Sequence, residues 1–167
     1  MVYFVLTAIA AVIFTLYVVM VTREGGIRPS LSDSYYLLEG RSKGLGMAFY
    51  VMLMLVVFTC IAPMCEVAGG FGVLAGFALL LVGAAPKFKD RKAMERTLHI
   101  GGAVVAAIVA IIVLARARVI YIVLPSLVLF LALAVASKTL RKSLVFWAEM
   151  AAFYALFAGL CIYFYPF

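Results

Sequence analysis

The distribution of basic residues around six apolar runs constrains the fold of this chain more than any other feature. The runs cover residues 2–22, 45–63, 68–85, 99–115, 119–136 and 143–165. Each run holds about 17–23 residues, enough for an α-helix to cross a hydrocarbon core roughly 30 Å thick. The sequence therefore predicts an all-α membrane protein, built as a bundle of six transmembrane helices.

The composition leaves no room for a soluble domain. Of the 167 residues, 68% are hydrophobic and 13% are charged, more apolar surface than a soluble domain of this size can bury. We expect one integral membrane domain over residues 1–167. The first run lacks a basic segment before it and exceeds the apolar length of a signal peptide, so we interpret it as a retained helix.

The basic residues also predict the orientation. Arg116 and Arg118 lie in the fourth gap between runs, and the other twelve of the 14 Lys and Arg lie in the first, third and fifth gaps. Basic loops stay in the cytoplasm, so both termini are expected outside it. We expect a multi-pass protein, most simply of the bacterial inner membrane.

This arrangement explains the net charge of +7 without a nucleic-acid partner. Basic side chains at helix ends attract anionic lipid headgroups by about 1 kcal/mol each. The residues predicted to make these headgroup contacts are Lys87, Lys89, Arg91, Lys92, Arg141 and Lys142.

Local signals predict further details of the bundle. In the longest gap, residues 23–44, Ser32 or Asp33 is a candidate N-cap for a short interfacial helix over residues 35–39. Small residues at i, i+4 spacing predict close contact between the helices at 68–85 and 99–115. They are Gly72 and Gly76 on the first, and Gly102, Ala106 and Ala110 on the second.

Glu149 is the strongest candidate for a functional side chain. It lies about seven residues inside the last run, roughly 10 Å below the interface. An ionisable group at that depth is costly and must be paired, hydrated or neutral. Three interpretations stay open: a packing bond to a neighbouring helix, a ligand or proton site, and a lipid-facing side chain. We expect it to face the bundle, with His99 as the nearest partner.

Other polar residues on the same membrane side complete the predicted ligand pocket. Glu95 and His99 are four residues apart and share a helix face. Ser32, Asp33 and Tyr36 form a hydroxyl-rich group in the first long loop. The alternatives are a lone interfacial histidine, and turn and cap chemistry in the loop.

Metal, cofactor and catalytic motifs are not predicted. His99 is the only histidine, and Cys60, Cys65 and Cys161 have no metal-ligand spacing. A disulfide from Cys161 to Cys60 or Cys65 is one interpretation, and three small buried hydrophobic side chains are the other. No nucleophile or phosphate-binding motif is present, so the enzyme question stays open, leaning to no.

Two segments carry a resemblance to a known family. They are P-S-L-S-D-S-Y-Y at residues 29–36, and G-A-A-P-K-F-K at residues 83–89 leading to E-R-T-L-H-I-G-G-A at residues 95–103. Together, about a fifth of the chain, they resemble the damage-regulated autophagy modulator (DRAM-type) family of six-helix membrane proteins and its bacterial relatives. Those proteins are in turn similar, more distantly, to the alkaline-ceramidase-like superfamily.

The resemblance implies that Ser32, Asp33, Glu95 and His99 are the family's polar positions. Two departures limit it. The charge count here places the loop after the first helix in the cytoplasm, whereas the family loop lies outside. The ceramidase-like hydrolases need several histidines around a metal, so metal-dependent hydrolysis does not carry over to a chain with one histidine.

These features favour a small binding protein for a lipid or another membrane ligand, with a pocket open to the cytoplasmic leaflet. Its expected partners are membrane lipids. One alternative is an accessory subunit that packs against another membrane protein or a second copy of itself. The other is a small proton-coupled transporter.

Overall fold

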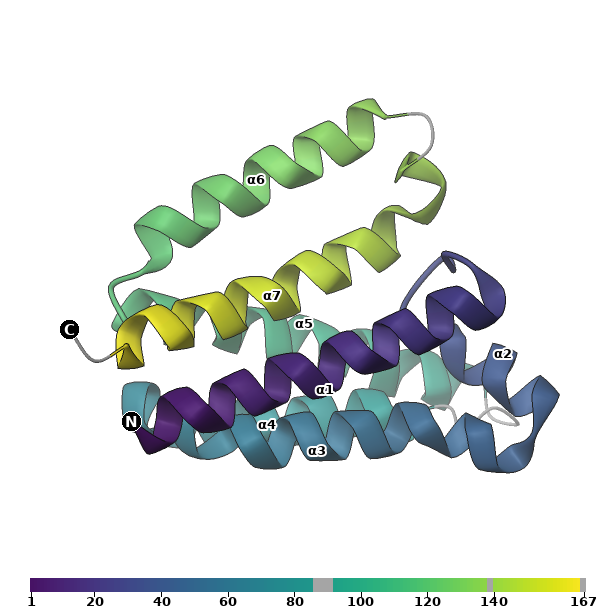
Figure 1. Ribbon diagram of the computed structural model, residues 1–167, viewed down its shortest axis with the longest axis horizontal. Coiled ribbons are helices and arrows are strands. Elements are labelled where there is room, and N and C mark those ends of the chain that lie inside the picture. The colour runs from purple at the N-terminus through teal and green to yellow at the C-terminus, as the bar shows by residue number, and fades with distance from the viewer. Residues whose placement is uncertain (86–91, 138–139, 166–167) are drawn as a thin grey trace.

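The chain is all-α in the parts that the structure, a computed structural model, describes: residues 1–85, 92–137 and 140–165. In order, the elements are α1 (Val2–Gly25), α2 (Ser34–Arg41), α3 (Lys43–Ala68), α4 (Gly70–Ala84), α5 (Lys92–Arg116), α6 (Ile120–Ala136), the 3-10 turn η2 (Leu140–Ser143) and α7 (Leu144–Phe164). The long helices run alternately up and down, and the two termini lie at the same end of the bundle (Figure 1).

Four of these helices are long and apolar enough to cross a membrane. The qualifying segments are Val2–Gly25, Gly44–Ala68, Thr97–Arg116 and Leu140–Phe164. The helices α4 and α6 are apolar but hold only 15 and 17 residues. The structure thus supports a multi-pass membrane protein by helix length and composition.

Each predicted apolar run corresponds to one helix, but two predicted boundaries were wrong. The helix expected to end at Pro63 continues to Ala68, because one proline removes a single backbone hydrogen bond and the apolar surroundings favour keeping the rest. The helix expected to begin at His99 begins at Lys92. Apolar runs mark only the part of a helix that suits lipid, so the polar first turns of α5 were missed.

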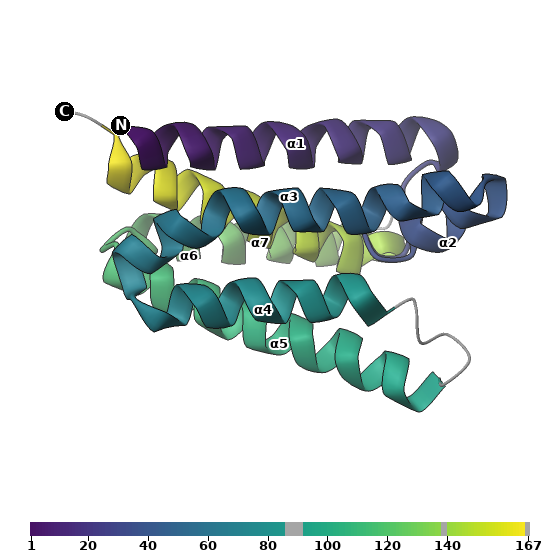
Figure 2. The same cartoon turned by 90° about the horizontal axis from the view of Figure 1, so that it is seen from below.

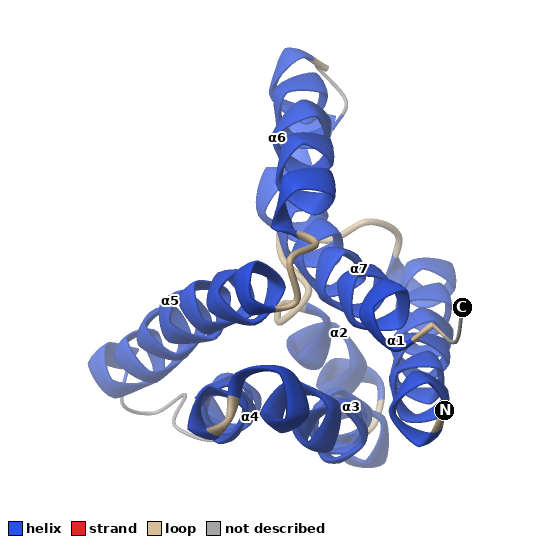
Figure 3. Ribbon diagram, turned by 90° about the vertical axis from the view of Figure 1, so that its left-hand side faces the viewer, coloured by secondary structure: helices blue, strands red, loops and turns tan. Residues whose placement is uncertain are grey.

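The helices pack around a shared core to which α1, α3, α4, α5 and α7 contribute buried side chains. Helix α1 lies antiparallel beside α3, with the short α2 at the far end, and α4 and α5 form an antiparallel pair below them (Figure 2). An end-on view shows α7 at the centre and α6 at the periphery, where it packs chiefly on α7 (Figure 3).

Helix α2 confirms the predicted short helix after the first long one, but not its predicted capping. Asp33 is the N-cap residue of α2, yet its side chain makes no capping hydrogen bond. The Asp33 carboxylate instead pairs with Arg28 Nη2 at 2.7 Å. Ser42 does cap α3, because its hydroxyl accepts a hydrogen bond from Leu45 N at 3.1 Å.

The small-residue contacts differ from the prediction. Helices α4 and α5 do pack together, and a Cβ on Gly102 would lie 2.9 Å from the Ala78 carbonyl oxygen. Gly72 and Gly76, however, face α3: a Cβ on Gly72 would lie 2.5 Å from Cys65 N. Gly69 alone, at φ 60°, joins α3 to α4, and this tight hairpin places the small face of α4 against α3.

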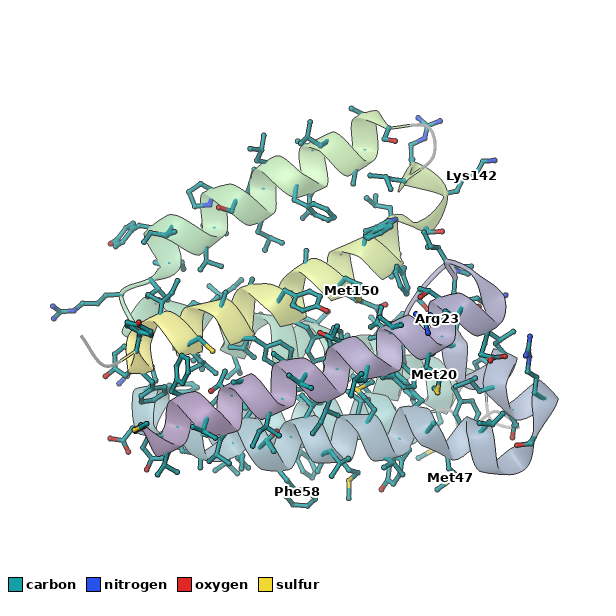
Figure 4. All side chains as sticks on the ribbon, viewed as in Figure 1. Met20, Arg23, Met47, Phe58, Lys142 and Met150 are labelled. Atoms are coloured by element: carbon teal, nitrogen blue, oxygen red, sulfur yellow. The ribbon has the colours of Figure 1, made fainter. Side chains whose placement is uncertain are left out.

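Aromatic residues join α1 to α7 in the core. The fully buried Phe14 ring lies 4.5 Å from the Phe153 ring centroid and 5.7 Å from that of Phe157. Large apolar side chains also cover the outside of the bundle, and Phe58, 63% exposed, points away from α3 (Figure 4). An apolar exterior of this kind suits contact with lipid tails.

Candidate functional site

The segment between α1 and α2 folds back into one end of the bundle. Gly26, at φ 71°, ends α1 and turns the chain. The carbonyl oxygen of Pro29 accepts a hydrogen bond from Phe146 N in the first turn of α7, at 3.1 Å. Leu31 is only 3% exposed, and the fully buried Ser34 hydroxyl lies 2.5 Å from Tyr17 Oη on α1. We call residues 26–33 the inner loop.

Glu149 holds the centre of the inner loop. Leu31 N donates a hydrogen bond to Glu149 Oε2 at 2.6 Å. Inside an apolar bundle, a loop amide needs such a partner because lipid offers none. Glu149 therefore joins α7 to a segment 118 positions earlier in the chain.

Two further contacts tie the inner loop to its surroundings. Ser32 Oγ lies 3.1 Å from His99 Nε2, which connects the loop to α5. Arg28 pairs with Asp33 within the loop, with Nε 2.9 Å from Asp33 Oδ2. The loop is thus bonded to α5 and α7, and Ser34, the first residue of α2 after it, is bonded to α1.

Beneath the inner loop lies a cavity of about 350 Å³ between α3, α4, α5 and α7. Its walls are almost wholly apolar, and Ser32 and Glu149 carry the only polar side chains among the lining residues that the structure describes. The residues that line it are Leu31, Ser32, Phe49, Leu53, Met64, Ala75, Leu79, Val82, Ala103, Val104, Ala106, Ala107, Ala110, Ala148, Glu149, Ala152, Phe153 and Leu156.

The cavity opens between α5 and α7. Its exposed lining residues all come from these two helices: Val104 and Ala107 on α5, and Ala152 on α7. The lining residues of α3 and α4 are buried or half-buried. Figure 3 shows α5 and α7 diverging from each other. In a membrane, this opening would face lipid.

Alanines on α5 create the space. Ala103, Ala106, Ala107 and Ala110 follow the i, i+3, i+4, i+7 pattern of one helix face, and all four line the cavity. The spacing of Ala106 and Ala110 was interpreted as a packing surface. Ala106 and Ala110 instead lie on the face of α5 that borders the cavity, where the alanine methyl groups are too small to fill the space.

The structure brings together some of the predicted site residues. Glu149 faces into the bundle as expected and shares the cavity wall with Ser32, and His99 is one hydrogen bond further away. His99 was expected to be the nearest partner of Glu149, but the described hydrogen bond to Glu149 comes from the Leu31 amide.

The remaining predicted residues lie elsewhere. Asp33 forms an ion pair with Arg28. Tyr36 is exposed on α2, and its ring centroid lies 5.3 Å from that of Tyr35. The Glu95 side chain is outside the described part of the structure.

The predicted headgroup contacts are described only in part. Arg141 and Lys142 are exposed on η2, and Lys142 and Arg23 lie toward the end of the molecule that carries the inner loop (Figure 4). Lys87, Lys89 and Arg91 lie outside the described residues, as does the side chain of Lys92.

The described residues contain no group of three or more His, Cys, Asp or Glu side chains arranged to hold a metal ion. The three cysteine thiols are free, with Cys60 buried and Cys65 and Cys161 half-buried. The polar side chains of the site, among the described residues, are the Glu149 carboxylate, which accepts hydrogen bonds, and the Ser32 hydroxyl, which can donate and accept them.

Comparison of the chain with protein-family models, with curated proteins and with solved structures found no match. The resemblance to the DRAM-type family therefore stays a prediction.

Proposed function

We propose that this protein binds the apolar chain of a lipid-like amphiphile in the cavity between α3, α4, α5 and α7. The observation that carries the proposal is the apolar cavity of about 350 Å³ that opens between α5 and α7 and has Glu149 at the inner loop. Known ligand pockets range from about 300 to 1,000 Å³ and combine apolar walls with few polar groups. A volume at the low end favours one alkyl chain over a two-chain phospholipid.

The proposed membrane arrangement has six crossings, with both termini outside the cytoplasm. Twelve of the 14 basic residues then lie on the cytoplasmic side, as the positive-inside rule requires. The inner loop and Glu149 belong to that side, so the ligand's polar end would lie at the cytoplasmic leaflet, where the basic loops attract anionic lipid. A bacterial inner membrane is the proposed location.

Glu149 distinguishes this proposal from an accessory-subunit role. A subunit that used Glu149 for assembly would present it to a partner chain, whereas here it lies on the wall of an interhelical cavity. A proton-coupled transporter would need the same cavity and carboxylate. Binding is thus the step that both remaining hypotheses share and that this geometry supports.

Filling the cavity tests the proposal. Ala152→Phe places a ring at its opening, and Ala158→Phe makes the same change at an exposed position of α7 that does not line it. The proteins are placed in phosphatidylcholine nanodiscs with dodecanol, and native mass spectrometry counts the retained probe. We expect one dodecanol on wild type and A158F, and none on A152F. Equal retention by all three proteins would refute the proposed site.

A further inference from the structure

The polar end of the cavity must decide which amphiphile binds. An alkyl chain that moves from lipid into an apolar protein cavity gains little, because lipid tails are as apolar as the cavity walls. Discrimination therefore depends on the groups that meet the ligand's head. Among the lining residues these are Ser32 and Glu149.

Glu149 has one oxygen available to a ligand. Oε2 accepts the hydrogen bond from Leu31 N, and no described residue bonds to Oε1. The described chain contains no fully buried side-chain oxygen that lacks a partner, so Oε1 is accessible. Because Glu149 lines the cavity, this oxygen is an acceptor at the end of an otherwise apolar space.

The charge around this oxygen favours a cation. Among the residues that the structure describes, the cavity lining includes no Lys or Arg. Of the described basic side chains at this end of the molecule, Arg28 is paired with Asp33, and Arg23, Arg141 and Lys142 are exposed. A carboxylate in an apolar cavity is unfavourable unless an opposite charge or hydrogen-bond donors accompany it. An acidic head group would add repulsion, whereas an ammonium group would supply both the charge and the donors.

Building on the proposed function, we propose that the ligand is a single-chain amphiphile with a protonated amine head group. Its ammonium nitrogen donates a hydrogen bond to Glu149 Oε1, and its alkyl chain occupies the space beside the alanines of α5. The hydrogen bond from Leu31 N holds the carboxylate in place, so little ordering of Glu149 accompanies binding.

Three probes with the same chain test the head-group preference: dodecylamine, dodecanol and dodecanoic acid. Each is titrated near neutral pH, where an alkyl amine is protonated, into wild type in nanodiscs of zwitterionic phosphatidylcholine. The same titration with A152F measures partition into the lipid, and it is subtracted. We expect dodecylamine to bind at least about tenfold more tightly than dodecanol, the usual size of a hydrogen bond between charged groups. Dodecanoic acid should bind most weakly.

Glu149→Gln removes the charge and keeps an oxygen that accepts from Leu31 N. In this variant we expect the ratio of amine to alkanol affinity to fall to about one, and its unfolding midpoint shows that it is folded. Equal affinities in wild type, or an amine preference that survives in E149Q, would refute the head-group assignment and leave the proposed function standing. Binding of no probe above the A152F level would refute both.

Discussion

A single carboxylate connects the inner loop to the bundle. Leu31 is almost fully buried, and its amide must be bonded because neither lipid nor the apolar neighbours offer an acceptor. Glu149 Oε2 supplies that acceptor at 2.6 Å. The free-energy cost of burying the Glu149 side chain is thereby offset, because the buried Leu31 amide needs a hydrogen-bond acceptor. The same residue thus closes one end of the cavity and offers its second oxygen to a ligand.

Two substitutions of Glu149 separate its acceptor role from its charge. Glu149→Ala leaves Leu31 N without a partner, which we expect to lower the free energy of unfolding by about 1–3 kcal/mol. Glu149→Gln keeps an acceptor and should cost less than half as much. Thermal unfolding compares the three proteins, and hydrogen exchange follows the Leu31 amide. Equal protection of that amide in E149A and wild type would contradict the hydrogen bond.

The sequence predicted that Glu149 faces the bundle, because a bare acid at that depth is too costly. It could not predict the partner. Every residue except proline carries a backbone amide N–H, so nothing in the sequence distinguishes the Leu31 amide as a partner. The prediction therefore named His99, because its polar side chain can be identified from the sequence. The fold of the inner loop depends on hydrogen bonds to α5 and α7, which are distant in sequence, and on the bond between the next residue, Ser34, and Tyr17 of α1.

The helices pack according to how tightly the chain connects them. Gly69 links α3 and α4 directly, so these two helices must lie side by side, and Gly72 and Gly76 serve that hairpin. Helices α5 and α7 have no such link. They diverge, and the alanines of α5 leave the space between them open. Each of the six apolar runs corresponds to one helix, although two boundaries were wrong, and small residues alone could not show which helices would meet.

Two glycines of the same bundle provide a matched test of this packing. A Cβ on Gly72 would lie 2.5 Å from Cys65 N and 2.7 Å from the Met64 carbonyl carbon, so Gly72→Ala must push α3 and α4 apart. We expect a loss of about 1–3 kcal/mol, the usual cost of overpacking. Gly101 lies within α5 with nothing inside 4 Å, and Gly101→Ala should be neutral or stabilise by about 0.5–1 kcal/mol. Unfolding midpoints measured in one detergent compare the variants, and a G72A midpoint at or above wild type would contradict the hairpin packing.

The molecule as a whole combines an apolar exterior with one polar end. Its four long helices and two shorter ones leave large apolar side chains on the outside, and the inner loop lies at the end that carries the described basic residues Arg23, Arg141 and Lys142. The positions of Lys and Arg along the sequence already indicate that asymmetry, and the orientation they imply stays a prediction. A pocket that includes Glu149 was part of the prediction, but its apolar walls could not be predicted, because the space exists only where four helices fail to fill it.

Photolabelling tests most directly whether that space is a binding site. A dodecyl probe with a diazirine at its chain end is added to wild type in phosphatidylcholine nanodiscs, irradiated, and mapped by peptide mass spectrometry. We predict labelling on residues 103–110 of α5 and 148–156 of α7 that unlabelled dodecanol reduces and Ala152→Phe abolishes. Labelling of exposed outer residues such as Phe58 and Leu129 should not respond to either. Labelling confined to such outer residues, or cavity labelling that neither treatment changes, would contradict the account.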